Sequence, residues 1–212
     1  ISLAPAVAQA AMLSGVATRP MADINLYREK LSQFVYRTGL LMKPMFERAR
    51  ADMKRVVYAE GEEETVLRAV QTVVDEGLAR PILIGRPSVI ARRIEKLGLR
   101  LKQGVDFDLT NLDDDPRFND YWQHYLQIME RHGVTPSAAK AIVRSRSTVV
   151  AALMLKRGEV DAMLCGIVGK YQGKLKHVIN IIGIDPNVSC ISALSVVISD
   201  KGPLFFTDTH VQ

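Results

Sequence analysis

Two strand-and-helix units follow one another in the middle of this 212-residue chain and constrain its fold more than any other feature. The apolar runs Arg55–Ala59 and Pro81–Gly85 have the length and composition of buried strands. The segments after them, Glu62–Glu76 and Ser88–Leu97, have the apolar spacing of amphipathic helices. Strands that alternate with helices in this way usually lie parallel in one sheet. We therefore expect an α/β protein with a parallel sheet covered by helices.

The first part of the chain has a different, helical character. Residues 1–12 are rich in alanine, and Asp23 is placed to cap a second helix. We set the domain boundary close to Lys54, which gives a helical linker in residues 1–53 and the α/β domain in residues 54–212. Because the sequence starts without a methionine and ends in a strand-like run, we also expect it to be part of a longer chain.

An apolar run, a glycine-broken loop and a lysine-rich helix follow one another in Val160–Val178. The unpaired N–H groups and the partial positive charge at a helix N-terminus favour an anion. Lys170, Lys174 and His177 are spaced to share one face of this helix, which would strengthen the same site. The alternative is an ordinary strand-to-helix connection with solvated lysines, and from these residues alone the two interpretations are even.

Other polar side chains follow predicted strands, where ligands bind in open α/β sheets. Glu60 opens a run of glutamates after the first strand, and the helix dipole explains it less well than the glutamates that follow it. Arg86 follows the second strand and could fork onto a phosphate, although a surface arginine is nearly as good an explanation. Thr207 and Asp208 follow the last predicted strand, where Asp208 could simply cap a turn.

Composition favours a small anionic ligand over a nucleic acid or a membrane. The net charge is +5 and the pI about 9.3, but with 6% aromatic residues the basic charge is too diffuse for nucleic acid. No apolar run is long enough to cross a bilayer. The two cysteines lie inside apolar runs, which is typical of free thiols in the cytoplasm. None of the four histidines has the spacing of a metal site, so we predict no metal.

Four segments taken together resemble the phosphate acetyltransferases: RVVYAEGEEETVLRAV, PILIGRP, VDAMLCG and FFTDTHV. The resemblance is closer to the phosphotransacetylase-like C-terminal domain of bacterial NADP-dependent malic enzymes, and it spans roughly Met53–Gln212. It implies a parallel-sheet, three-layer subdomain of the phosphate acetyltransferase type, with part of a second α/β subdomain. Linker helices and the end of the malic enzyme domain would precede it, and the domain would be truncated at its C-terminus.

The same resemblance identifies positions that differ from active transferases, in which a serine and a glycine end the strand before a His-Ser-Thr loop. Here Cys165 replaces that serine, Gly169, Lys170 and Tyr171 occupy the loop, and Lys176 stands for an arginine of the following helix. A lysine keeps the charge of an arginine but loses its two-pronged geometry, and the small hydroxyls are gone. The resemblance therefore implies a site that retains the shape for coenzyme A and lacks part of the chemistry.

On this basis we expect a regulatory region that binds acetyl-CoA as an effector, contributes to a homo-oligomer and has no catalytic residue of its own. The parent malic enzyme would use NADP and a divalent metal in a domain outside this chain. An active transferase that moves an acetyl group between coenzyme A and phosphate is the alternative, and an oligomerisation domain with an empty cleft is a third. The residues expected to contact acetyl-CoA or phosphate are Arg86, Gly166, Gly169, Lys170, Tyr171, Lys174, Lys176, Thr207 and Asp208.

Overall fold

The computed structural model describes residues 3–21, 23–35, 37–189, 191–199, 202–207 and 209. The chain divides into two compact units. One is Ala49–Ser189, and the other combines Ile1–Arg48 with Cys190–Gln212. The domain boundary expected at Lys54 lies a few residues inside the larger unit and stays a prediction. Among the described helices, none combines the length and the apolar character that crossing a membrane requires.

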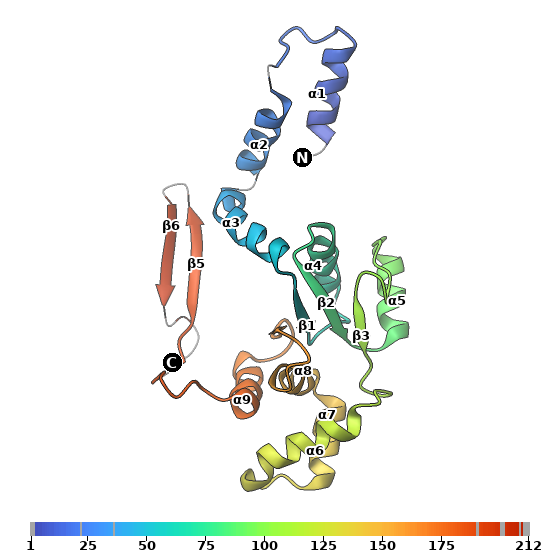
Figure 1. Cartoon of the computed structure of the whole chain (residues 1–212), viewed down its shortest axis with the longest axis vertical. Coiled ribbons are helices and arrows are strands. Elements are labelled where there is room, and N and C mark those ends of the chain that lie inside the picture. The colour runs from blue at the N-terminus through green and yellow to red at the C-terminus, as the bar shows by residue number, and fades with distance from the viewer. Residues whose placement is uncertain are drawn as a thin grey trace. The chain divides into compact units, whose positions relative to one another are not determined.

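A parallel sheet of four strands forms the centre of the larger unit (Figure 1). The strands lie in the order β3-β2-β1-β4, and each neighbouring pair is parallel. This order places the turns after β1, β2 and β4 along one edge of the sheet, and it confirms the parallel sheet that the sequence predicts. The strands are β1 (Lys54–Tyr58), β2 (Ala79–Ile84), β3 (Asp108–Thr110) and β4 (Ala162–Leu164).

Side chains alternate between the two faces of the sheet, and each face has its own core. On one face Tyr58 and Leu83 pack in a cluster with helices α4 (Glu64–Asp75) and α5 (Pro87–Lys96). On the other face Val57, the neighbour of Tyr58 in sequence, packs in a second cluster to which four helices contribute. Helices therefore cover both faces, which is the three-layer α/β arrangement that the resemblance implied.

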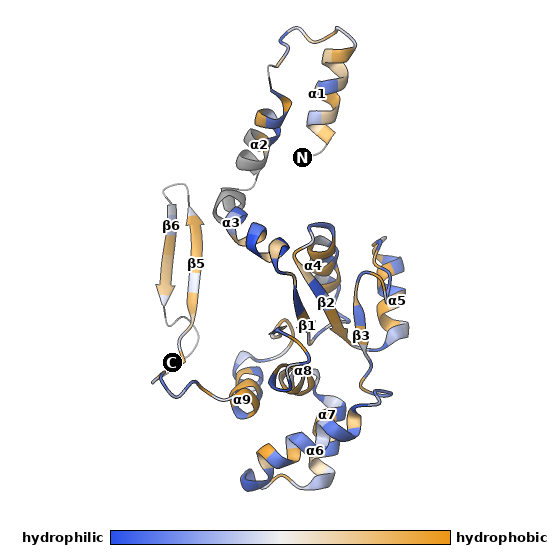
Figure 2. Cartoon of the chain, viewed as in Figure 1, coloured by the Kyte–Doolittle hydropathy of each residue, from blue (hydrophilic) through white to orange (hydrophobic). Residues whose placement is uncertain are grey.

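The helices of the second face are α6 (Phe118–Met129), α7 (Pro136–Ser145), α8 (Ser147–Lys156) and α9 (Tyr171–Ile182), with a short 3₁₀ turn at Glu130–His132 after α6. Helix α8 is predominantly apolar (Figure 2). Its residues from Thr148 to Met154 are all buried. A helix with no polar face is stable only when it is surrounded by protein. Helix α8 is thus the central helix of this layer, and its N-terminus has a fixed position.

The turn after β1 passes very close to β2, and Gly61 is the residue that permits this approach. A β-carbon at this position would lie 2.8 Å from the carbonyl oxygen of Ile84 and 2.8 Å from the β-carbon of Leu83. The Gly61 N–H donates to the same Ile84 oxygen at 3.1 Å, so the two turns are joined by their backbones. Glycine at this position holds the polar segment 60–62 against the edge of the sheet.

The smaller unit begins with α1 (Leu3–Leu13) and α2 (Ile24–Val35), followed by α3 (Arg37–Ala51), which runs into the larger unit. The Asp23 carboxylate accepts the N–H of Asn25 at 2.7 Å and that of Leu26 at 3.2 Å. This is the geometry of an N-cap, and the predicted cap of the second helix is confirmed.

The same unit contains a ribbon of two antiparallel strands, β5 (Leu194–Ser199) and β6 (Gly202–Thr207). The last predicted strand, which ends before Thr207, corresponds to β6. Large apolar side chains on both strands are exposed: Leu194 is 60% exposed and Phe205 is 65% exposed. The ribbon therefore presents an apolar surface.

We expect Gly61→Ala to lower the free energy of unfolding by about 1–3 kcal/mol, because the added methyl group overlaps the backbone of β2. Thermal denaturation of the purified protein would measure this loss. Gly173→Ala is the matched control, since a β-carbon there meets no atom within 4 Å and alanine is the better helix former. Equal melting temperatures of the two variants would contradict this account of Gly61.

Candidate functional site

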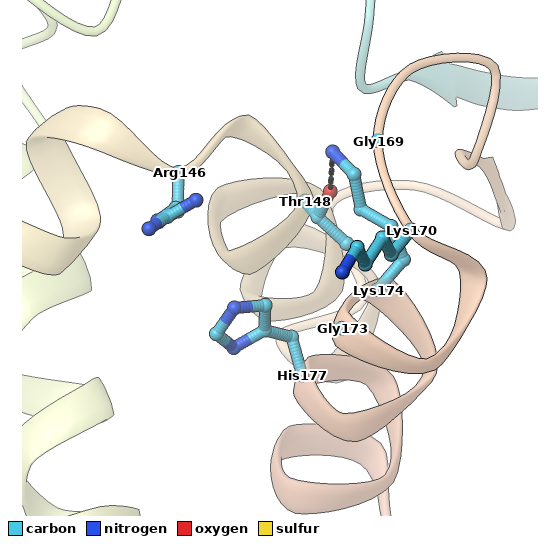
Figure 3. A pocket seen from close by; sticks show the side chains of 7 residues that line it. All are labelled: Arg146, Thr148, Gly169, Lys170, Gly173, Lys174 and His177. Carbon is cyan, nitrogen blue, oxygen red and sulfur yellow. Dashed lines mark hydrogen bonds between the residues drawn. The ribbon is translucent and has the colours of Figure 1, made fainter.

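A cavity of about 320 Å³ lies between the N-termini of α8 and α9, at the edge of the sheet where β1 and β4 end (Figure 3). Three cationic side chains and a histidine line it together with two glycines and a threonine. The lining residues are Arg146, Thr148, Gly169, Lys170, Gly173, Lys174 and His177. All lie within the larger unit, so the cavity belongs to one compact part of the protein.

Two segments of non-helical backbone, one before each helix, form this cavity. Arg146 is extended, with φ −122°, and separates α7 from α8. Gly169 has φ +91°, a conformation that suits glycine, and Lys170 then caps α9 in an extended conformation. Both helices begin at the cavity, so the partial positive charges of two helix N-termini act on the same space.

The side chains add to this positive field. In Figure 3, Arg146 and His177 face the space between the two helices from opposite sides. Burial lowers the pKa of His177, and the positive charges of Arg146 and Lys174 lower this pKa further. Carboxylates, which would line a site for a cation, would instead raise the pKa of the imidazole. The field in the cavity therefore favours an anion.

Lys174 makes the strongest polar contacts at the cavity wall. Its ammonium nitrogen lies 2.8 Å from an oxygen of Glu60 and donates to the Thr148 hydroxyl at 2.9 Å. The Glu60 side chain is only 9% exposed and that of Lys174 is 25% exposed. The Gly166 N–H also donates to Glu60, at 3.2 Å. Lys174 is thus part of a largely buried ion pair as well as part of the cavity wall.

The structure brings together three of the residues expected to bind acetyl-CoA or phosphate. Gly169, Lys170 and Lys174 line the cavity, and Gly166 is linked to it through Glu60. His177, which the sequence placed on the same helix face as the two lysines, lines it as well. The spacing of these residues along α9 is therefore reflected in their positions around one cavity.

Four other expected ligands are not among the residues that line the cavity in the described part of the larger unit. Tyr171 and Lys176 belong to α9 and are exposed, but neither lines the cavity. Thr207 is at the end of β6 in the smaller unit, and Asp208 lies outside the described residues. A ligand role for these four residues stays a prediction.

Arg86 lies at the expected edge of the sheet, but its guanidinium is bound by a neighbouring carboxylate. It donates to both oxygens of Glu62 at 2.8 Å, and the Arg86 backbone N–H donates to Glu62 at 2.9 Å. These hydrogen bonds lower the pKa of Glu62. Arg86 does not line the cavity, so the two-pronged contact that the sequence suggested for a phosphate is made here to a glutamate.

Arg146 and Thr148 are functional candidates that the sequence did not single out. Both lie where the chain passes from α7 to α8. A basic residue directly before an apolar, buried helix is the signal that would have identified Arg146.

Cys165 follows β4 and is exposed as a residue, although its sulfur is partly covered. Burial of its sulfur raises the thiol pKa, and the nearby Glu60 carboxylate raises it further. A raised pKa leaves less thiolate, so the local field works against a nucleophilic role. In the part of the chain that the structure describes, no three metal-ligating side chains gather as they would around a metal ion.

A sequence profile of the family described as phosphate acetyl/butaryl transferase matches residues 40–212. The chain belongs to this family. It is 28% identical, over 177 residues, to a phosphate acetyltransferase of Clostridium acetobutylicum, which covers 81% of this chain and 52% of that protein. The solved structure of an EutD phosphotransacetylase from Staphylococcus aureus aligns with a TM-score of 0.70 at 18% identity, over 81% of this chain and 51% of that one.

Higher identity is found with malic enzymes. The chain is 52% identical over its whole length to an NADP-dependent malic enzyme of Escherichia coli, and 50% identical to an NAD-dependent malic enzyme of Rhizobium meliloti. It spans 28% of the length of each of these relatives. The resemblance to the phosphotransacetylase-like domain of bacterial malic enzymes is thereby confirmed.

We expect Lys174→Met to reduce the free energy of unfolding by about 2–4 kcal/mol, because it leaves the Glu60 carboxylate largely buried without its counter-charge. Urea denaturation would measure the loss. Lys176→Met removes an exposed lysine of the same helix and serves as the control, with little change expected. Similar stabilities of the two variants would show that the ion pair contributes nothing.

We also expect anion binding to be linked to protonation of His177. A bound anion favours the charged imidazole and raises its lowered pKa, so affinity for sulfate should increase as the pH falls from about 8 to about 5. The limiting gain is about tenfold for each unit by which the pKa rises on binding. Calorimetric titrations across this range would measure it. In His177→Gln, which keeps Arg146, Lys170 and Lys174, a pH dependence as steep as that of the unmodified protein would contradict the assignment.

Proposed function

We propose that this chain is the regulatory region of a malic enzyme and that its cationic cavity binds acetyl-CoA through a phosphate group. The parent polypeptide would convert malate to pyruvate and carbon dioxide with a nicotinamide coenzyme. The E. coli relative is named for NADP and the R. meliloti relative for NAD. Acetyl-CoA bound at this region would inhibit malate oxidation in the domain outside this chain.

The observation that carries the proposal is the cavity itself. Two helix N-termini and the side chains of Arg146, Lys170 and His177 surround one space of about 320 Å³. Coenzyme A carries phosphate groups at one end, and each is a strong acceptor of charge-assisted hydrogen bonds. A pocket lined by three cationic side chains and a histidine suits that end of the molecule better than the acetyl end.

Binding without acetyl transfer is supported by the residues of the loop before α9 and by the position of Lys176. Transfer between coenzyme A and phosphate requires donors for the oxyanion and a base for the thiol. The loop carries Gly169, Lys170 and Tyr171 where the resemblance implies small hydroxyls in active transferases. Lys176, at the position of the family's arginine, does not line the cavity. These differences support an anion site that binds acetyl-CoA without transferring its acetyl group.

One observation favours the alternative, an active phosphate acetyltransferase. His177 lines the cavity, and its lowered pKa keeps the imidazole largely neutral near pH 7. A neutral imidazole beside a bound coenzyme A could accept the thiol proton as a general base. In this second candidate His177 accepts the thiol proton. The first candidate, binding without transfer, involves no proton transfer.

We include homo-oligomer contacts in the proposal. The exposed apolar side chains of β5 and β6 are the candidate surface, because exposed apolar patches of this kind are typical of contact sites. A purely structural oligomerisation region with an empty cavity would bind no acetyl-CoA, which the following titration detects.

Calorimetric titration of the intact malic enzyme polypeptide with acetyl-CoA tests the binding proposal. We expect saturable binding that Arg146→Ala weakens by roughly tenfold or more, as is typical for loss of a hydrogen bond to a charged group. The same variant should require correspondingly more acetyl-CoA to inhibit malate oxidation. Lys176→Ala, which removes a lysine that does not line the cavity, should bind as the unmodified protein does. Absence of binding by the intact protein would overturn the proposal.

An assay of thiol release from acetyl-CoA in the presence of phosphate separates the two candidates. We expect no release above the uncatalysed rate by the intact polypeptide. Turnover that His177→Gln abolishes, with acetyl-CoA binding retained, would instead establish the transferase.

A further inference from the structure

Glu60 contacts the cavity wall through Lys174, and it does not line the cavity itself. It follows β1 directly, and its carboxylate is nearly buried, at 9% exposed. An isolated charge in such a position is costly, so the two groups that contact it matter. These are the Lys174 ammonium at 2.8 Å and the Gly166 N–H at 3.2 Å.

Lys174 is therefore shared between the protein and any ligand of the cavity. An ammonium group has three N–H bonds. One is directed to the Thr148 hydroxyl at 2.9 Å (Figure 3) and one to Glu60, which leaves one for a bound anion. The charge of Lys174 is also balanced by Glu60 before a ligand arrives. Lys174 therefore attracts an anion in the cavity less strongly than a lysine without a paired carboxylate would.

We propose that Glu60 sets the anion affinity of the cavity by occupying Lys174, so that the intact protein binds a phosphate group more weakly than the same cavity without this carboxylate would. The proposal rests on the anion-binding function proposed above, and it adds the residue that limits that function. A phosphate that contacts Lys174 must share this ammonium group with Glu60. The two negative charges then lie close to each other and repel, which weakens binding. Weak binding is useful in an effector site, because the site can then respond to a change in effector concentration instead of being permanently filled.

A second carboxylate at the same edge of the sheet provides a matched control. Glu62 holds Arg86 as Glu60 holds Lys174, at 2.8 Å, and both glutamates belong to the turn after β1. Neither Glu62 nor Arg86 lines the cavity. Glu60→Gln and Glu62→Gln therefore change the net charge of the protein equally, and only the first releases a cation of the cavity wall. Glutamine in place of Glu60 retains an oxygen to accept the Gly166 N–H.

The experiment is calorimetric titration of the intact polypeptide with inorganic phosphate, repeated with acetyl-CoA. We expect Glu60→Gln to bind phosphate roughly three- to tenfold more tightly than the unmodified protein, because one like charge is removed and Lys174 becomes available. Glu62→Gln should bind as the unmodified protein does. In Glu60→Gln/Lys174→Met the gain should disappear, since the released cation is absent. Melting temperatures measured alongside show that each variant is folded, and the double variant, which carries no unpaired charge, covers the case in which a single variant is unstable.

The outcomes separate this proposal from the proposed function. Equal phosphate affinities of the unmodified protein and Glu60→Gln, both measurable, would overturn the role of Glu60 and leave the anion site standing. Weaker binding by Glu60→Gln would also overturn it, and would show that the carboxylate holds the loop in its binding conformation. Binding by Glu60→Gln alone would support it in its strongest form. If no variant binds phosphate or acetyl-CoA, both proposals fail together. Equal gains in phosphate affinity in Glu60→Gln and Glu62→Gln would show that only the net charge matters. That result would overturn the specific role of Glu60.

Discussion

The contact between Glu60 and Lys174 holds together the part of the molecule on which its chemistry depends. Through Glu60 it reaches the turn after β1 and, by way of the Gly166 N–H, the loop after β4. Through Lys174 and Thr148 it reaches the first turns of α9 and α8. Three separate regions of the sequence, near residues 60, 148 and 166–174, therefore meet at this ion pair. Because both side chains are largely withdrawn from water, their attraction is stronger than that of a surface pair, and either charge alone would be costly to keep.

Much of the fold follows from local patterns that the sequence displays. The strands of the sheet are short apolar runs, and the helices between them have an apolar stripe at helical spacing, so β1, α4, β2 and α5 were predictable in order. The break between α7 and α8 was predictable because an apolar helix is interrupted by polar residues there. The shared face of Lys170, Lys174 and His177 follows from helical geometry alone, and the cavity contains all three.

The rest of the site depends on distances between segments, which no local pattern encodes. Arg86 has the position in sequence of a phosphate ligand, but a carboxylate 24 residues earlier, Glu62, reaches it first. Glu60 was recognised as poorly explained by the helix dipole, yet its partner Lys174 could only be found once α9 was packed on the sheet. Which charges neutralise each other within the protein, and which remain for a ligand, is decided by tertiary packing. This is why the shared face of α9 was easier to predict than the full set of residues that line the cavity.

The ribbon formed by β5 and β6 has a practical consequence for work on this stretch of sequence. Within the residues that the structure describes, the two strands pair only with each other, and Leu194 and Phe205 are among the apolar side chains that stand exposed on them. A two-stranded ribbon is marginally stable in water, and its unpaired edges can recruit further strands from neighbouring molecules. Produced by itself at high concentration, this stretch should therefore aggregate through its ribbon while the three-layer unit stays folded, and lysine substitutions at the exposed apolar positions would be the first remedy for insolubility.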